Sequence, residues 1–260
     1  MLFHIGAFQL DTDSKKITLW HNLAAQTRLL VILIFLLGIV LTPNGSWFHW
    51  SIYAIVILGL VILTRVKINI ILRRVAVESV FLGVALVGTL FRSGGEVLWR
   101  WGWLQVTSEG LIILGSIFTK ALLSLILLNL LTMTTAIPDL LKALLVLRTP
   151  PLLVAIMVSM YRYINVLIRE LQAMQRAAAS RNFQGRDSWQ RLVVGNIVGS
   201  LFVRTYDRGE RVYQAMLSRG YQGIPTPEIP SKMKFKDKLA IAITIIFVGL
   251  SKFSLLLKVA

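Results

Sequence analysis

The sequence predicts an all-α integral membrane protein with about five transmembrane helices and a cytoplasmic block of amphipathic helices between the fourth and the fifth. The first observation is composition: hydrophobic residues make up 56% of the 260 residues, charged residues make up 15%, and the mean hydropathy is +0.71. A soluble domain of this length usually has a lower apolar and a higher charged fraction. The second observation is that five long apolar runs occur, with one long basic stretch before the last of them.

The basic charge is concentrated in one part of the chain. Lys and Arg number 28 against 12 Asp and Glu, a net charge of +16, and 16 of the 28 lie between Lys142 and Lys238. These cations alternate with Leu and Val runs rather than forming a solvated recognition surface, which disfavours nucleic acid as a partner. The chain has no cysteine, which excludes disulfides and thiolate metal ligands. We expect no cleavable signal peptide in the first 25 residues.

The five apolar runs lie at about 29–41, 50–63, 75–91, 111–133 and 239–257. A helix needs about 20 predominantly apolar residues to cross a bilayer core, so each run with its flanks is long enough. A sixth segment, 152–168, is also long enough but is interrupted by Arg162 and followed by Arg169 and Glu170. We therefore expect 152–168 to stay outside the membrane.

The charges of the loops predict the orientation. Loop 42–49 has no Lys or Arg, whereas 64–74 has four, and short cytoplasmic loops carry the excess of Lys and Arg. Loop 92–110 has balanced charges and the sequence WRWGW at 99–103, which is typical of an interfacial aromatic belt on the outer face. The basic stretch falls on the cytoplasmic side only if 152–168 does not cross. We expect the N-terminus inside and the C-terminus outside, with a membrane domain at 1–134, a cytoplasmic domain at 135–235 and a final transmembrane helix at 236–260.

The cytoplasmic domain is predicted to be helical. A short amphipathic helix covers 136–148, and Pro150 and Pro151 end it and begin a longer helix. A third helix covers 188–219. Stripes at spacings of three and four follow both long helices: Met157, Tyr161, Ile164, Ile168, Leu171, Gln175 and Ala178 in one, and Leu192, Gly195, Gly199, Phe202, Tyr206, Gly209, Tyr213 and Met216 in the other.

The small residues Gly195 and Gly199 would let another backbone approach closely, so we expect the two long helices to cross there. The alternative is that both helices lie flat on the membrane surface as basic interfacial helices.

One polar hexamer, Ser-Arg-x-aromatic-Gln-Gly, occurs twice, at 180–185 and 218–223, which is 38 positions apart. Asn182 and Gly220 tolerate a left-handed backbone, so each hexamer is predicted to end a helix with a Schellman-like turn. The next residue, Phe183 or Tyr221, would then fold back toward Ala178 or Met216.

Arg181 and Arg219 would occupy the last helical position in these two copies. The helix dipole favours a cation there by roughly 0.3 to 1 kcal/mol. That accounts for the arginines but not for the recurring Ser, aromatic, Gln and Gly. The repeat therefore favours a duplicated docking element that presents an arginine to two equivalent surfaces.

Two equivalent surfaces indicate a partner with two-fold or pseudo-two-fold symmetry. A dimeric nucleotide-binding ATPase beneath a membrane subunit is such a partner. The chain contains no Gly-x-x-x-x-Gly-Lys-[Ser/Thr] sequence, so it has no phosphate-binding loop of this type. The energy for any ATP-driven process would then come from another subunit.

These motifs resemble the transmembrane (T) components of energy-coupling factor transporters, most closely the CbiQ-like branch associated with cobalt uptake. The family has Ala-Arg-Gly-like motifs at the ends of two coupling helices, which here are Ser180-Arg181-Asn182 and Ser218-Arg219-Gly220. The segments RGERVYQAMLSRGYQG at 208–223 and LWHNLAAQTRLL at 19–30 are also similar to the family. The chain departs from it at Asn182, where the family has glycine, and at 24–26, where Ala, Ala and Gln replace the frequent Asp, Pro and Arg.

The resemblance implies a non-catalytic scaffold in a bacterial inner (plasma) membrane, which joins two cytoplasmic ABC-type ATPases to a separate substrate-binding membrane S component. ATP and Mg²⁺ would bind the ATPases, and this chain would hold no cofactor. The expected coupling residues are Ser180, Arg181, Asn182, Ser218, Arg219 and Gly220, supported by Phe183, Gly185, Tyr221 and Gly223. The implied cargo is cobalt, with nickel or a vitamin as alternatives in the same role, and a secondary transporter as a different alternative.

Other polar residues give weaker indications. His4, His21 and His49 are scattered and have no ligand spacing, so we expect no metal site. We find no paired carboxylates, activated nucleophile or phosphate loop that would indicate an enzyme. Glu78 and Lys120 lie in or near spans, where charge is costly. We expect Glu78 to pair with Arg74, and Lys120 to face a partner subunit or to extend toward the membrane surface.

Overall fold

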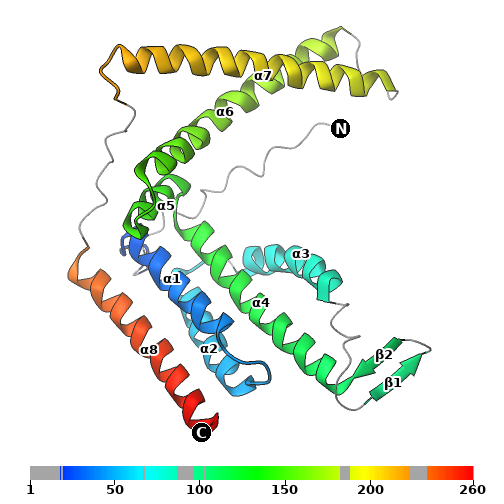
Figure 1. The fold of residues 1–260 in the computed structure, drawn as a ribbon, viewed down its shortest axis with the longest axis vertical. Coiled ribbons are helices and arrows are strands. Elements are labelled where there is room, and N and C mark those ends of the chain that lie inside the picture. Colours follow the sequence, from blue (N-terminus) through cyan, green and yellow to red (C-terminus); the bar gives the residue numbers. More distant parts are fainter. Residues whose placement is uncertain are drawn as a thin grey trace. The chain divides into compact units, whose positions relative to one another are not determined.

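The computed structural model describes residues 18, 20–66, 68–86, 97–101, 104–181, 188–222 and 233–259. These residues form helices joined by turns, together with one small hairpin (Figure 1). The helices confirm the predicted all-α class. The contacts divide the chain into two compact units. We call Met1–Ala143 with Ser231–Ala260 the bundle, and Leu144–Pro230 the crossed pair.

The bundle is organised around one long helix, α4. The helices of this unit are α1 (Ala25–Val40), α2 (Trp47–Thr64), α3 (Ile68–Leu86), α4 (Ser108–Thr134), α5 (Ile137–Ala143) and α8 (Phe235–Val259). Helix α4 packs against α1, α2 and α3, and α1 also contacts α5 and α8. Thus the last helix of the chain returns to lie beside the first (Figure 1).

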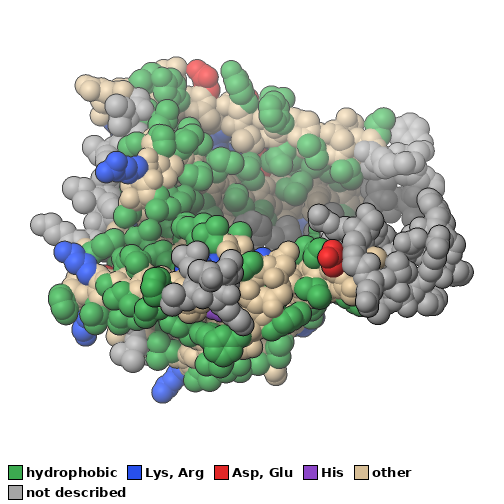
Figure 2. All heavy atoms as spheres, turned by 60° about the horizontal axis from the view of Figure 1, so that its bottom comes forward, with side chains coloured by type: hydrophobic (Ala, Val, Ile, Leu, Met, Phe, Trp, Pro, Cys, Tyr) green, Lys and Arg blue, Asp and Glu red, His purple; other side chains and the backbone are tan. Residues whose placement is uncertain are grey.

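The bundle has an apolar interior and an apolar exterior. Ile39, Tyr53, Leu127 and Leu130 are fully buried in its core. Large hydrophobic side chains also point outward along the same helices, and Phe81 is 82% exposed. Green hydrophobic side chains cover much of the face shown in Figure 2. Exposed apolar surface around helices of this composition is expected of a protein whose solvent is lipid.

Local sequence explains where several helices begin and end. The Thr107 hydroxyl accepts a hydrogen bond from the Gly110 amide at 3.2 Å and caps α4, with Glu109 in the first turn, where the helix dipole favours an acid. Gly45 has a φ of +84° in the turn between α1 and α2. Pro151 occupies the first position of α6, where its missing amide hydrogen costs nothing.

The structure adds a feature that the sequence analysis did not predict. Within loop 92–110, strands β1 (Val97–Trp101) and β2 (Leu104–Thr107) pair antiparallel, with Trp101 opposite Leu104 and an irregularity between Val97 and Trp99. Valine, tryptophan and threonine favour the extended backbone, and these residue types occur in the two strands. It leads directly into α4.

Three helices among the described residues are long and apolar enough to cross a membrane by length and composition: α2, α4 and α6 (Pro151–Ser180). Helix α1 is a shorter apolar helix. Helix α3 contains three charged residues, Arg73, Arg74 and Glu78, and the predicted span at 75–91 lies partly outside the described residues. Composition therefore does not separate α6 from the spans, and its location outside the membrane stays a prediction.

The boundaries of the two units differ from those of the predicted domains. The predicted cytoplasmic domain at 135–235 describes a location relative to the membrane and stays a prediction. By contacts, α5 packs against α1, so the first boundary between the units follows Ala143. The second boundary lies between Pro230 and Ser231. The predicted short helix at 136–148 is two elements, α5 and a 3-10 helix at Leu144–Leu147, and the boundary falls between them.

The crossed pair consists mainly of two long helices, α6 and α7 (Ser188–Leu217). They contact each other and cross, and from the crossing their C-terminal ends point in opposite directions (Figure 1). Each of these ends carries one copy of the repeated hexamer. This arrangement places Arg181 and Arg219 on opposite sides of the crossing.

Candidate functional site

The second hexamer ends α7 with a complete Schellman turn. The Tyr221 amide donates to the Met216 carbonyl at 3.0 Å, the Gly220 amide donates to the Leu217 carbonyl at 2.9 Å, and Gly220 has a φ of +84°. These are the two hydrogen bonds and the left-handed residue that define this helix stop. The prediction for Gly220 and Tyr221 is therefore confirmed, while Gly223 lies outside the described residues.

The first hexamer is described only as far as Arg181. Helix α6 ends at Ser180, and the Arg181 amide donates to the Ala178 carbonyl at 3.1 Å. The Ser180 hydroxyl donates to the Ala177 carbonyl at 2.9 Å, and the Ser218 hydroxyl donates to the Ala215 carbonyl at 3.0 Å in the same way. The residues Asn182, Phe183 and Gly185 lie outside the described residues.

The two arginines are exposed at the helix ends. Each lies slightly beyond the position predicted for it, because α6 ends at Ser180 and α7 ends at Leu217, so Arg181 and Arg219 belong to the caps. Among the described residues, neither guanidinium has a hydrogen bond or an ion pair. Both are therefore available to groups outside this chain.

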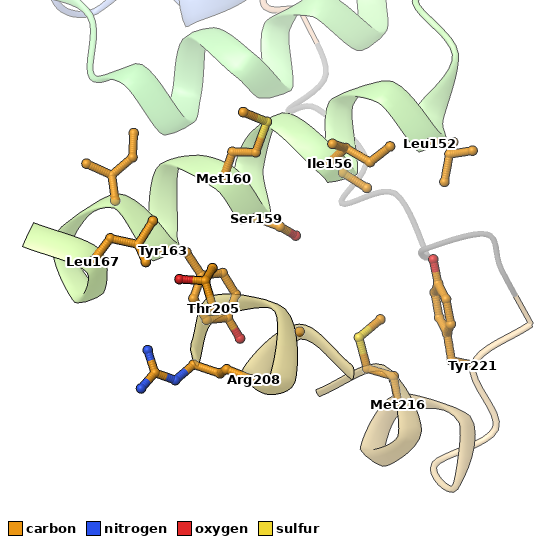
Figure 3. Close-up of a pocket in the computed structure, with 13 residues that line it drawn as sticks. Leu152, Ile156, Ser159, Met160, Tyr163, Leu167, Thr205, Arg208, Met216 and Tyr221 are labelled. Carbon is orange, nitrogen blue, oxygen red and sulfur yellow. The ribbon is translucent and has the colours of Figure 1, made fainter. Parts of the chain in front are cut away.

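An apolar groove of about 480 Å³ lies between α6 and α7. Leu152 and Ile156 of α6 line it, together with Met216 and Tyr221 (Figure 3). The Tyr221 side chain points toward Leu152 (Figure 3). The Schellman turn thus explains the aromatic residue of the second hexamer, because the turn directs it back into the groove.

The helices do not meet where the sequence analysis predicted. A side chain added at Gly195 or Gly199 would meet no atom within 4 Å, so these glycines are open in this structure. The two helices instead meet at a polar contact. Arg208 of α7 donates to Glu170 of α6 at 2.7 Å, and Arg204 lies 3.7 Å from the same carboxylate. The glycine spacing indicated a close approach, but α6 reaches α7 further along the helix.

Most of the predicted stripe on α7 also lies away from α6. Phe202, Tyr206 and Tyr213 are 73%, 68% and 51% exposed. Of the two stripes, only Ile164, Gly209 and Met216 line the groove. The spacing of three and four residues correctly predicted a helix, but much of the apolar face of α7 is exposed in this structure.

A polar cluster in the bundle was missed by sequence reasoning. Asp237, at the start of α8, is buried and accepts hydrogen bonds from the Ala24 amide at 3.0 Å and the Lys234 amide at 2.8 Å. Arg28 donates to the carbonyls of His21 and Thr134. The cluster joins the segment before α1 to the end of α4 and the start of α8. The family-like segment at 19–30 contains Arg28, but no pattern in it pointed to Asp237.

The two charged residues singled out in the spans have partners in the bundle. Glu78 accepts a hydrogen bond from Asn129 at 2.9 Å, which replaces the predicted pairing with Arg74. Lys120 donates to Asn44 at 2.9 Å and lies 5.9 Å from the centre of the Trp50 ring. The Nε2 atom of His49 is 2.9 Å from the Ser254 hydroxyl. No group of three His, Asp or Glu that could hold a metal ion occurs within the described ranges.

Comparison with known proteins identifies the family in which these features occur. The family described as cobalt transport protein, CbiQ, matches residues 17–230. The energy-coupling factor transporter transmembrane protein EcfT 1 of Listeria monocytogenes is 30% identical over 79% of this chain and 81% of its own. The EcfT protein of Lacticaseibacillus paracasei is 29% identical over 78% and 81%. A putative fused cobalt transport protein, CbiMQ, of Methanocorpusculum labreanum is 29% identical over 65% of this chain and 29% of its own.

Proposed function

Because the chain belongs to the CbiQ family of cobalt transport proteins and is a multi-pass transmembrane component of the energy-coupling factor type, we propose that it couples two cytoplasmic ATPases to a substrate-binding membrane subunit. In this role it performs no catalysis. The ATPases bind ATP and Mg²⁺, and their closure moves α6 and α7. The helices pass that movement to the membrane subunit.

The observation that carries the proposal is the pair of arginines at matched helix ends. Arg181 and Arg219 occupy the same position in the two copies of the hexamer, just beyond the ends of two crossed helices. Both are exposed and have no partner among the described residues. Guanidinium is a rigid fork of donors that stays charged, which suits insertion into a groove lined by acidic or carbonyl groups. Two matched arginines on one chain suit two copies of one ATPase, or two related ATPases.

The uncovered apolar surfaces of α6 and α7 support a second partner. The groove beside Leu152 and Ile156, and the exposed face of α7 at Phe202, Tyr206 and Tyr213, leave hydrophobic side chains without cover. Exposed apolar patches of this kind mark protein or membrane contacts. We assign them to the substrate-binding membrane subunit.

Cobalt is the proposed cargo, since the matching family is described as a cobalt transport protein. Nickel or a vitamin would be carried by the same mechanism with a different substrate-binding subunit. The orientation follows from loop charge: the N-terminus is cytoplasmic, in a bacterial plasma membrane, and the basic crossed pair faces the cytoplasm.

The test is purification of the chain with its genomic neighbours, followed by uptake in vesicles. The wild type should bring down two ATPases and accumulate cobalt only with ATP. Arg181→Ala and Arg219→Ala should each weaken ATPase binding, and the double variant should abolish both binding and uptake. Arg176→Ala and Arg211→Ala remove exposed arginines from the same helices and serve as controls.

Unchanged assembly and uptake in the double variant would exclude the proposed role of the arginines. Uptake without ATP or ATPases would instead indicate a secondary transporter. Accumulation of nickel or a vitamin in place of cobalt would change the cargo and leave the coupling role intact.

A further inference from the structure

The ion pair at the crossing joins two positions that are equivalent in the duplicated sequence. The hexamers are offset by 38 residues, so each residue of the second copy corresponds to the residue 38 positions earlier in the first. Arg208 and Glu170 are also 38 positions apart, and they form the 2.7 Å contact between α7 and α6. The crossing therefore pairs a position with its own counterpart.

A residue contacts its own counterpart only on a two-fold axis. The directions of the helices agree with such an axis, since the C-terminal ends of α6 and α7 leave the crossing in opposite directions (Figure 1). Identical charged residues on an axis would repel each other. Here one copy has Glu and the other has Arg, so the repulsion is replaced by an ion pair.

On such an axis, the two helix arms, meaning the stretches from the ion pair to Arg181 and to Arg219, have equal length. Arg181 follows Glu170 by eleven positions, and Arg219 follows Arg208 by eleven. At about 1.5 Å per residue, each arginine lies about 16 Å along its helix from the ion pair. Equal arms on opposite sides of one point are what a symmetric pair of docking surfaces requires.

The ion pair is also the directional part of the contact. Glu170 is the only acidic residue of α6, its side chain is 16% exposed, and both described ion pairs between the helices end on it. The groove beside it is apolar, and the hydrophobic free energy of such a contact depends on buried area rather than on direction. A charge-assisted hydrogen bond has a defined geometry.

We infer that Glu170 and Arg208 are a positioning pair on a local two-fold axis. This ion pair holds α6 and α7 at the crossing and sets Arg181 and Arg219 at equal distances from it. The role of the equal distances in docking two ATPases rests on the proposed function. The position of the ion pair and its effect on the helix crossing do not.

The full chain allows a direct measurement, because it has no cysteine of its own. Ser180→Cys and Ser218→Cys place spin labels at exposed matched positions next to the two arginines. In nanodiscs, we expect one narrow distance distribution for the labelled wild type. Glu170→Arg, which sets three arginines together, should broaden or shift it, and Glu170→Arg with Arg208→Glu should restore it. Glu210→Arg on the exposed side of α7 is the matched control.

The assembled transporter provides a readout that loss of fold alone would not give. With both ATPases bound, Glu170→Arg should lower cargo uptake per ATP hydrolysed by roughly fivefold or more, and the exchanged pair should recover it. Glu170→Gln keeps the shape of the side chain and is used if Glu170→Arg does not fold. It should change the label distances and the uptake per ATP hydrolysed in the same directions.

Equal distance distributions in all variants, or failure of the exchanged pair to restore the wild-type distribution, would overturn the inference. If the wild type binds no ATPase, the proposed function fails, while the label distances still decide whether the ion pair holds the crossing. If the wild type binds and transports but the Glu170 variants couple normally, the positioning role fails alone.

Discussion

The bundle and the crossed pair bury very different amounts of their apolar surface. The bundle has a continuous core that includes Trp20, Phe35, Tyr53 and Leu127. In the described part of the crossed pair, Val154 is the one buried hydrophobic side chain. Part of the difference is composition, because charged residues are spread along α7 whereas α1 and α2 are almost entirely apolar.

The rest of the difference lies in what each unit packs against. Helix α4 is surrounded by other helices of its own chain, whereas α6 and α7 have mainly each other. Two crossed helices touch over a short length, which leaves residues such as Ile156, Phe202 and Tyr206 uncovered. The bundle therefore has its own core, while the crossed pair leaves most of its apolar side chains exposed, as the proposed partners require. The substitutions below compare the two units, from the largest expected effect to the smallest.

Removal of the Asp237 carboxylate should have the largest effect. Asp237→Ala leaves the Ala24 and Lys234 amides without their acceptor in a buried site, at a cost of more than about 2 kcal/mol. Asp207→Ala removes an exposed carboxylate of the crossed pair and should cost almost nothing. Thermal unfolding followed by tryptophan fluorescence reports on this directly, because Trp20 and Trp50 are buried in the bundle. Similar unfolding temperatures for the two variants would remove the contrast between the units.

Glycine substitutions compare the packing of the two units. A side chain at Gly38 would approach Val248 to 3.0 Å and the Tyr53 hydroxyl to 3.1 Å, so Gly38→Val should overpack the contact between α1 and α8, by about 1–3 kcal/mol. Gly199→Val meets open space and should be nearly neutral or slightly stabilising in the isolated chain. A loss of transporter assembly in Gly199→Val alone would show that a partner packs against that face.

The left-handed stop of α7 should be sensitive to a methyl group. Gly220→Ala forces a side chain into a φ of +84° at a cost of about 1–2 kcal/mol, whereas Gly209→Ala lies in the helix, in open space, and should stabilise it. Amide exchange of residues 214–222 should become faster in the first variant and slower in the second. Equal exchange in both variants would mean that the Schellman turn does not limit fraying of α7.

Loss of Arg204 should have the smallest effect. Its side chain is 60% exposed and lies 3.7 Å from Glu170, so Arg204→Ala should cost less than about 1 kcal/mol. Arg208→Ala removes the shorter contact at 2.7 Å and should loosen the crossing more. Label distances between positions 180 and 218 distinguish the two variants. A broader distribution for Arg204→Ala than for Arg208→Ala would reverse the assignment of the main partner.

The helix stop of the second hexamer was predicted correctly because the information for it is local. The helix stop at Gly220 and the fold-back of Tyr221 follow from residue types within one turn, and the structure has both. The crossing at Gly195 and Gly199 was not where the helices meet, because a small-residue spacing permits a close approach without specifying the partner. Asp237 was missed because its partner at Ala24 is far away in the sequence.

The sequence by itself determined the membrane class, the long helices and the two matched helix ends, because hydropathy, periodicity and turn chemistry act over a few neighbouring residues. Only the tertiary structure decided that Glu170 meets Arg208, that α5 belongs to the bundle, and that Tyr221 lines a groove. These contacts join residues whose separation carries no local signal. The repeat spacing of 38 stands in the sequence, but it specified an axis only once the ion pair was seen to share it.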